Sequence, residues 1–262
     1  MNPTPRPPYE LDVSGVLTPT QFKDGTDLWL STRSAGGTAL TTCLLVPGGP
    51  TGPSGSSRLP AVYFPVMQIV ELVSAVGVQS IRARFVVLRD ANQQLRFTVA
   101  LYAVGADGTV LSSYYLANRY WPKTTSPVPH ANSGSRVSGL RLSRSVSKNV
   151  IPKALASYWV NNWTSSRYPT EPDLFTSAGQ PMQGYNFSVS DFMDPLRGLN
   201  NFGNQLLAMN FCLHTFLNFN GTVDAPVASL GLLLQMTNTT EKDEAGTEDE
   251  LYDVAHPSPP AP

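Results

Sequence analysis

The sequence has little charge, little cysteine and no long apolar run. Charged residues make up 14% of its 262 residues, which argues against coiled coils and long solvated helices. Its two cysteines, Cys43 and Cys212, cannot build a disulfide framework, and both lie in apolar runs, which indicates buried free thiols. No apolar stretch is long enough to cross a bilayer, and the opening MNPTPRPPYELD lacks the apolar core of a signal peptide. We therefore expect a soluble protein, made in a cytoplasm, without membrane insertion.

Signals of enzymatic chemistry are equally sparse. There are three histidines, of which His130 lies in a Pro-rich stretch, His214 in an apolar alternating run and His256 near the end. The sequence has no nucleophile elbow, phosphate-binding loop, dinucleotide fingerprint or zinc-protease motif. Asp191 and Asp194 could together hold a hard cation, although two carboxylates in a loop are more often simply solvated. We predict that the protein is not an enzyme and has no catalytic residues, metal site or cofactor.

What the sequence does contain is alternation with the period of two that is typical of β-strands. It is clearest between residues 77 and 104, where two strands, 78–89 and 95–104, flank the polar turn 90–94. In the first strand, one face carries four apolar residues, Ile81, Ala83, Phe85 and Val87. The other face carries Arg82, Arg84 and Val86.

Further strands are predicted along the rest of the chain. Residues 38–46, 109–119, 206–219 and 227–236 read as strands, and residues 61–73 read as a strand followed by a short helical turn. Residues 154–163 are ambiguous between a strand and a short helix. The 23 prolines also disfavour a helical protein, and no internal repeat is visible. The pattern predicts an all-β fold with about eight strands and long loops.

The two ends differ from the body in composition. Residues 1–34 are rich in proline and predict an extended N-terminal arm. Residues 241–262 carry seven acids and one base, a net charge of −6, and predict a disordered acidic tail. Residues 35–240 between them are expected to form one domain. The body without this tail has a net charge of +5, which the whole-chain value of −1 conceals.

The most pronounced charge feature is a window without acids between Asp107 and Glu171. Its 63 residues contain eight bases, five of them in the run SRVSGLRLSRSVSKNVIPK. Lysine and arginine neutralise phosphate without reading sequence, so the run predicts contact with nucleic acid. The alternative is a solvated loop that is merely basic or is offset by the acidic tail. The residues predicted to face nucleic acid are Arg136, Arg141, Arg144, Lys148 and Lys153.

Aromatic residues offer a second candidate surface. Four tryptophans, with several tyrosines, could form a platform on which sugars stack, although packing in a core or an interface is the commoner role for such residues. These residues are Trp29, Trp121, Trp159, Trp163, Tyr114, Tyr115, Tyr120 and Tyr158.

The layout of these segments resembles the single jelly-roll coat proteins of small icosahedral positive-strand RNA viruses. The resemblance rests on a Pro-rich arm, the run RLPAVYFPVMQIVELVSAVGVQSIRARFVVLRDANQQLRFTVALYAV, a long middle section and two final apolar strands. It implies an eight-stranded jelly-roll β-sandwich with disordered termini that assembles with copies of itself, and possibly other coat proteins, into a shell around genomic RNA. It also implies a location in the virion, and in the host cytoplasm during assembly.

The sequence departs from this family in its arm. Many such coat proteins begin with a strongly basic arm, whereas Arg6 is the one base here before Lys23. RNA contact is therefore expected from the bases of residues 119–153, and the acidic tail is expected on the outside of the particle, away from nucleic acid. The alternative function is a β-sandwich recognition module, either a viral spike or a carbohydrate-binding domain that uses the Trp/Tyr cluster.

Overall fold

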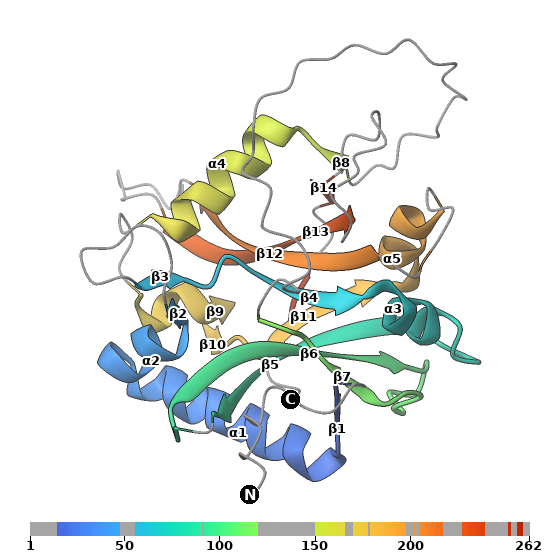
Figure 1. Cartoon of the computed structure of the whole chain (residues 1–262), viewed down its shortest axis with the longest axis horizontal. Coiled ribbons are helices and arrows are strands. Elements are labelled where there is room, and N and C mark those ends of the chain that lie inside the picture. The colour runs from blue at the N-terminus through green and yellow to red at the C-terminus, as the bar shows by residue number, and fades with distance from the viewer. Residues whose placement is uncertain are drawn as a thin grey trace, which may run out of the picture.

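The body of the protein consists of two antiparallel β-sheets stacked face to face, with helices on their outer surfaces (Figure 1). The computed structural model describes residues 15–47, 56–90, 92–119, 150–165, 170–177, 179–197, 202, 205–216, 227–238, 251–252 and 256–258. The expected antiparallel β-sandwich is confirmed, but the fold also contains helices and is therefore not all-β.

The first sheet has the strand order of a Greek key. Its strands, in spatial order, are β1 (Val16–Leu17), β7 (Tyr114–Leu116), β6 (Leu95–Val104), β5 (Ser80–Arg89), β11 (Gly184–Ser188) and β15 (His256–Ser258). Three strands consecutive within this sheet, β5, β6 and β7, lie side by side, and the chain returns later to place β11 beside β5. The predicted hairpin of 78–89 and 95–104 is the β5–β6 pair, with Phe85 opposite Val99.

The second sheet is built on the last two long strands. It contains β4 (Ala61–Pro65), β12 (Gln205–Phe216), β13 (Val227–Asn238), β14 (Leu251–Tyr252) and β8 (Val150–Ile151). Two small ribbons complete the strands, β2 (Leu45–Pro47) with β3 (Ser56–Arg58) and β9 (Thr176–Ser177) with β10 (Gln180–Pro181). The predicted strands 206–219 and 227–236 are confirmed as the β12–β13 hairpin, which aligns Phe211 with Leu232.

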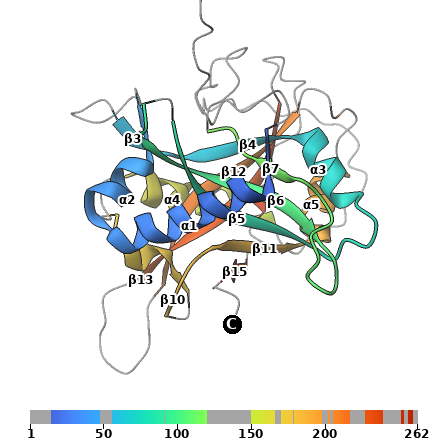
Figure 2. The same ribbon diagram turned by 90° about the horizontal axis from the view of Figure 1, so that it is seen from below.

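Within the described residues, five α-helices and one short 3₁₀ helix accompany the sheets. They are α1 (Pro19–Ala35), α2 (Gly37–Cys43), α3 (Val66–Val73), α4 (Lys153–Thr164), α5 (Val189–Leu196) and the 3₁₀ helix Pro172–Phe175. Helix α1 crosses the outer face of the first sheet, as the view from below shows (Figure 2). Helix α4 covers the outer face of the second sheet (Figure 1). The predicted strand and helical turn at 61–73 are β4 and α3, and the ambiguous segment 154–163 is helical.

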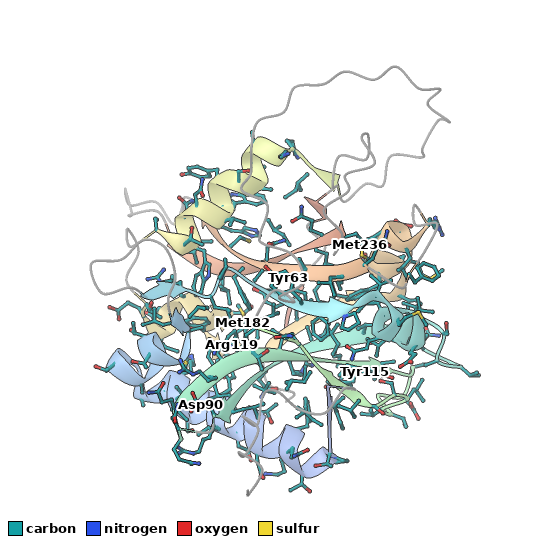
Figure 3. All side chains as sticks on the ribbon, in the orientation of Figure 1. Tyr63, Asp90, Tyr115, Arg119, Met182 and Met236 are labelled. Atoms are coloured by element: carbon teal, nitrogen blue, oxygen red, sulfur yellow. The ribbon has the colours of Figure 1, made fainter. Side chains whose placement is uncertain are left out.

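The core lies between the two sheets and is densely aromatic (Figure 3). Phe97 of the first sheet and Phe211 of the second meet with ring centroids 5.6 Å apart. The four residues predicted on one face of the first strand, Ile81, Ala83, Phe85 and Val87, are all fully buried in this core. Alternation in the sequence therefore predicted the inner face of the sheet correctly.

The N-terminal region differs from the predicted extended arm, because residues 19–35 form α1. The Thr18 hydroxyl accepts from the backbone N–H of Gln21, and the Gln21 side chain accepts from the backbone N–H of Thr18, which is a capping box. Pro19 at the first helical position supplies the right φ. The buried stripe of this helix passes through Gly25, Trp29 and Thr32, and glycine and threonine hide its apolar period in the sequence.

Two other expectations also change. Residues 38–46, predicted as a strand from their Thr, Leu and Val content, form α2 followed by the short β2, because Leu40 and Cys43 are spaced to bury one helical face. The tail, predicted to be disordered throughout, contributes β14 and β15, so it adds one strand to each sheet. Of the predicted strand 109–119, residues 114–116 are in β7.

Candidate anion-binding site

Two arginines stand side by side on the outer face of the first sheet. Arg82 and Arg84 alternate with the buried Ala83 and Phe85 along β5, so both project away from the core. The register places Tyr102 of β6 and Asn186 of β11 on either side of Arg82, and Gly184 of β11 beside Arg84. These strands therefore form a surface rich in hydrogen-bond donors.

Arg84 is a buried cation held by neutral groups. Its side chain is 8% exposed. Its Nη1 donates to the backbone oxygens of Ala83 and Tyr185, each at 3.2 Å, and both Nη1 and Nη2 donate to Oδ1 of Asn186, at 3.1 and 3.2 Å. Gly184, opposite Arg84 in the register, lets β11 lie so close to β5 that an added Cβ would be 2.0 Å from the Ala83 carbonyl oxygen.

Within the described part of the chain, Arg84 has no carboxylate as an ion-pair partner. Burial lowers the pKa of Arg84 from its ordinary value, the phenol of Tyr102 acts in the opposite direction, and the charge of Arg82 lowers the pKa further. Among the residues that the structure describes, no aspartate or glutamate forms an ion pair with Arg82 or Arg84. Arg82 is half-buried and makes no hydrogen bond within this part of the chain.

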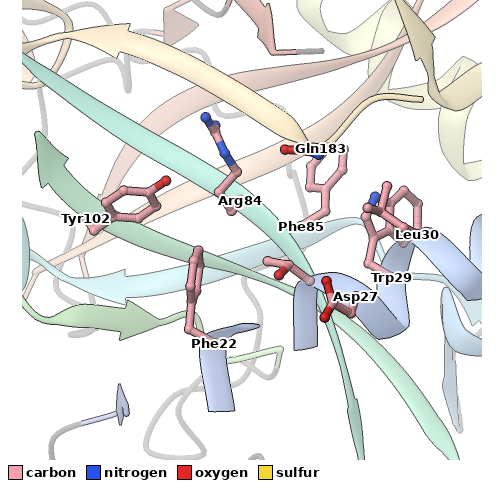
Figure 4. A pocket seen from close by; sticks show the side chains of 9 residues that line it. Phe22, Asp27, Trp29, Leu30, Arg84, Phe85, Tyr102 and Gln183 are labelled. Carbon is pink, nitrogen blue, oxygen red and sulfur yellow. The ribbon is translucent and has the colours of Figure 1, made fainter. Parts of the chain in front are cut away.

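A small pocket opens beside Arg84, between α1 and the first sheet (Figure 4). Its volume is about 170 Å³. Helix α1 contributes one wall and β5 and β6 contribute the other. The lining residues are Phe22, Thr26, Asp27, Trp29, Leu30, Arg84, Phe85, Tyr102 and Gln183. The pocket thus combines aromatic walls with the guanidinium, hydroxyl and amide groups of a few polar residues.

The aromatic wall is well ordered by ring contacts. Phe22 of α1 stacks on Tyr114 of β7 at 4.1 Å between ring centroids and meets Tyr102 edge to face at 5.3 Å. Asp27 is the one acid in the lining, and its carboxylate accepts from Lys23 at 2.5 Å on the exposed side of α1. Its charge is thus neutralised by Lys23, whereas that of Arg84 is not offset by any described residue.

Most residues predicted to face nucleic acid lie outside the described residues. Arg136, Arg141, Arg144 and Lys148 are in that group, and Lys153 is exposed as the first residue of α4. Arg119, which belongs to the same acid-free window, is 4% exposed and donates to the Leu45 carbonyl at 2.9 Å. Arg119 is therefore a buried structural residue and is not available to phosphate.

The tail lies next to the end of the basic segment. Strand β14 pairs antiparallel with β8, with Leu251 opposite Ile151 and Tyr252 opposite Val150. In the sequence, Glu250 directly precedes β14, and Lys153 follows β8 after one residue. The structure thus pairs Leu251 and Tyr252 of the tail with the strand that precedes Lys153, and the expectation that the tail lies away from nucleic acid stays a prediction.

The remaining candidate side chains have structural partners. His214 lies on β12, as expected, with Nε2 3.4 Å from the Cys212 sulfur and its ring 4.3 Å from that of Trp159 on α4. Asp191 accepts from the backbone N–H of Ser188 at 2.7 Å and so caps α5, while Asp194 pairs with Arg197 at 3.1 Å. Within the described ranges, no three His, Cys, Asp or Glu side chains are placed to hold a metal ion.

The predicted sugar-stacking surface does not form from the four tryptophans together. Trp29 and Trp163 are fully buried in the core, where both contact Phe175, and Trp159 is half-buried against His214. Tyr158 is 49% exposed on α4, and Trp121 and Tyr120 lie outside the described residues. Core packing, the commoner role, accounts for Trp29 and Trp163.

Sequence reasoning placed Arg82 and Arg84 on one strand face but did not recognise them as a site. The signal was present, because two bases at alternate positions of a strand must share a face. What the sequence could not supply was the position of α1, which forms the opposite wall of the pocket. That helix was predicted to be an extended arm.

Comparison with known proteins identifies no relatives. The chain matches no family model, no curated protein and no solved structure. Among the helices described, none is both long and apolar enough to cross a membrane.

Proposed function

We propose that this protein is a structural coat subunit that assembles with copies of itself, and possibly with other coat proteins, into an icosahedral shell around an RNA genome. In this proposal the subunit is found in the virion, and in the host cytoplasm during assembly, and it has no enzymatic activity. The observation that carries the proposal is the strand connectivity of the two packed sheets.

That connectivity supports a jelly roll, in which two Greek keys alternate between two sheets. The chain passes from β4 in the second sheet to the β5–β6 hairpin in the first, and then back to Asn118, which pairs with Tyr63 of β4. It next places β11 beside β5 in the first sheet and β12 beside β4 in the second. In chain order these six segments lie in the second, first, first, second, first and second sheets, which is the pattern of six jelly-roll strands. The two remaining positions would be filled by β13 beside β12 and β15 beside β11.

Exposed apolar side chains support self-association. Of the seven large apolar residues exposed in the described chain, five gather at the end of the sandwich where β5 begins and β6 ends. This apolar end comprises Met67, Val76, Val110, Leu111 and Met193, contributed by α3, two loops and α5, and Val76 is 95% exposed. Exposed apolar patches of this kind mark interaction surfaces, and a second copy of the chain is the partner that a shell requires.

Contact with RNA is proposed through non-specific phosphate pairing by Arg136, Arg141, Arg144, Lys148 and Lys153. The support is their charge in a long window without acids, and the exposed position of Lys153 at the start of α4. Replacing these five residues by glutamine should lower the RNA content of assembled particles and leave the fold intact. RNA content equal to that of the unmodified protein would remove this part of the proposal.

The decisive experiment is size-exclusion chromatography with light scattering, with absorbance recorded at 260 and 280 nm across the peak. A megadalton peak supports the shell, and a raised 260 nm signal supports packaged nucleic acid. A monomer or a small ring with a protein-only spectrum, persisting across salt and pH, would contradict the proposal. That result would favour a recognition module, which would then need a binding surface other than the buried Trp29 and Trp163.

A further inference from the structure

The pocket beside Arg84 has an uncompensated positive charge at its edge. Leaving a buried ion without an opposite charge is costly, so buried arginines normally pair with a carboxylate or an external anion. Arg84 is 8% exposed and its described partners are two backbone carbonyls and the amide oxygen of Asn186. Neutral acceptors orient a guanidinium but do not cancel its charge.

Arg84 also has N–H donors that have no acceptor among the described residues. A guanidinium has five N–H groups, and among the described residues Nη1 and one N–H of Nη2 have acceptors while Nε has none. Arg82 lies two residues earlier on the same face, and its guanidinium has no described partner. The two side chains together can offer several N–H groups to one oxyanion.

The rest of the pocket favours a planar group next to that anion. Its volume of about 170 Å³ is close to that of an engineered cavity of about 150 Å³ that holds benzene. Phe22 and Tyr102 present ring surfaces at its wall, and Thr26 and Gln183 supply polar groups. Proteins that bind single-stranded nucleic acid combine positive charge with aromatic side chains on which bases stack.

We infer that Arg82 and Arg84 bind a phosphate group and that the adjoining pocket accepts one base, so that the outer face of the first sheet holds a nucleotide of single-stranded RNA. The assignment of the bound phosphate group to RNA rests on the proposed function, whereas the phosphate-binding site itself does not. Asp27 lies on the exposed side of the pocket, where Lys23 neutralises it.

The test compares one double variant with one matched control. The double variant is Arg82→Gln with Arg84→Gln, and the single variant Arg82→Gln guards against a folding defect because Arg82 has no described structural partner. The control is Arg89→Gln, an exposed arginine at the far end of the same strand whose Nη1 donates to the Gln93 carbonyl at 3.3 Å. Circular dichroism checks that each variant is folded.

Two probes separate the phosphate site from RNA binding. The first is inorganic phosphate, measured as the rise in melting temperature over chloride at equal ionic strength, because a ligand that binds the folded state stabilises it. The second is a fluorescein-labelled decauridylate, measured by anisotropy at several salt concentrations. We expect the double variant to lose the phosphate-specific rise and to bind decauridylate at least about threefold more weakly, with a salt slope lower by about one or two. Arg82→Gln should show the same trend, and Arg89→Gln should match the unmodified protein.

Each alternative outcome counts against a defined part of the inference. An unchanged phosphate effect in the folded double variant would overturn the anion site. Loss of the phosphate effect with unchanged decauridylate binding would overturn its assignment to RNA. Failure of the protein to form shells would contradict the proposed function but would leave the phosphate result standing, so the two failures can be told apart.

Discussion

At the scale of single residues, Asp90 organises the turn between β5 and β6. Its Oδ2 accepts from Nε of Arg96 at 2.8 Å, and its Oδ1 accepts from the backbone N–H groups of Asn92 and Gln94 at 2.8 and 2.9 Å. Burial by itself raises the pKa of Asp90, but the hydrogen bonds from Arg96, Gln94 and Asn92 outweigh it and hold the pKa below its ordinary value of 3.8. The folded state therefore favours the charged carboxylate.

This depressed pKa predicts a pH-dependent contribution to stability. Because the folded pKa lies below the unfolded one, the stabilisation is fully present above pH 4 to 5 (about the unfolded value) and is lost as the pH falls through the folded pKa. Asp90→Asn should lower the free energy of unfolding by about 3 kcal/mol at pH 7, since it leaves the buried Arg96 without its negatively charged partner. Urea unfolding at several pH values should show this difference shrinking in acid. A difference that is constant with pH would contradict the assignment.

Gly184 predicts a second residue-scale effect. Its φ is +147°, and a Cβ there would lie 2.0 Å from the Ala83 carbonyl oxygen. Gly184→Ala should therefore be severely destabilising, because both the backbone conformation and the neighbouring strand must change. Gly77→Ala is the matched control, with a φ of +83° but nothing within 4 Å of the added carbon, and should cost about 1 to 2 kcal/mol. Thermal melting of the two variants measures the difference, and equal losses would contradict it.

At the scale of elements, α1 is anchored to the core between the sheets through Trp29. This side chain is fully buried, donates from Nε1 to the Met182 carbonyl at 2.9 Å and meets Phe85, Phe97 and Phe175. Trp29→Ala should lower the free energy of unfolding by about 3 to 5 kcal/mol in urea titrations. Tyr158→Ala, at an exposed position of α4, should change it by less than about 0.5 kcal/mol. Comparable losses would show that α1 does not stabilise the core.

The pairing of β14 with β8 predicts that tail charge weakens RNA binding. Asp249 and Glu250 directly precede β14 in the sequence and Asp253 directly follows it, while Lys153 follows β8, the strand paired with β14, after one residue. Neutralising them as Asp249→Asn, Glu250→Gln and Asp253→Asn should strengthen decauridylate binding at low salt by about threefold or more, because charges within a Debye length of about 10 Å interact. The control neutralises Asp24, Glu171 and Asp173, three exposed acids elsewhere. Equal affinities in both variants would contradict the prediction.

Element by element, the sequence predicted the long strands and missed the helices of the N-terminal region. The strands β5, β6, β12 and β13 were predictable because each places apolar side chains in the core at every second position, which the sequence shows as alternation. Helix α1 was missed because its buried stripe contains Gly25 and Thr32, although the capping box at Thr18 and Gln21 was a readable signal of a helix start. The tail strands were missed because they are only two and three residues long and pair through their backbones, which needs no apolar pattern. The pocket was not predicted either, because α1 forms one of its walls.

At the scale of the whole molecule, the apolar end predicts where copies of the chain meet. Met67→Glu with Val76→Glu places two charges in this surface, and both side chains are exposed, at 48% and 95%. Burying these charges in a contact is unfavourable, so the variant should elute as small species in size-exclusion chromatography with unchanged circular dichroism. The control Leu155→Glu, at an exposed position of α4 on the other side of the second sheet, should assemble normally. Normal assembly of the first variant would exclude the apolar end as a subunit contact.

The two cysteines give the molecule a pair of natural probes of local opening. Cys43 lies in α2 and Cys212 lies in β12 beneath α4; both are fully buried, and burial raises the pKa of Cys43 to about 12. Because a thiolate must be exposed to attack a disulfide reagent, each thiol reacts only when the helix over or around it moves away. The labelling rate of Cys212 would then report how often α4 lifts from the second sheet, and that of Cys43 how often α2 leaves the core, without any engineered label.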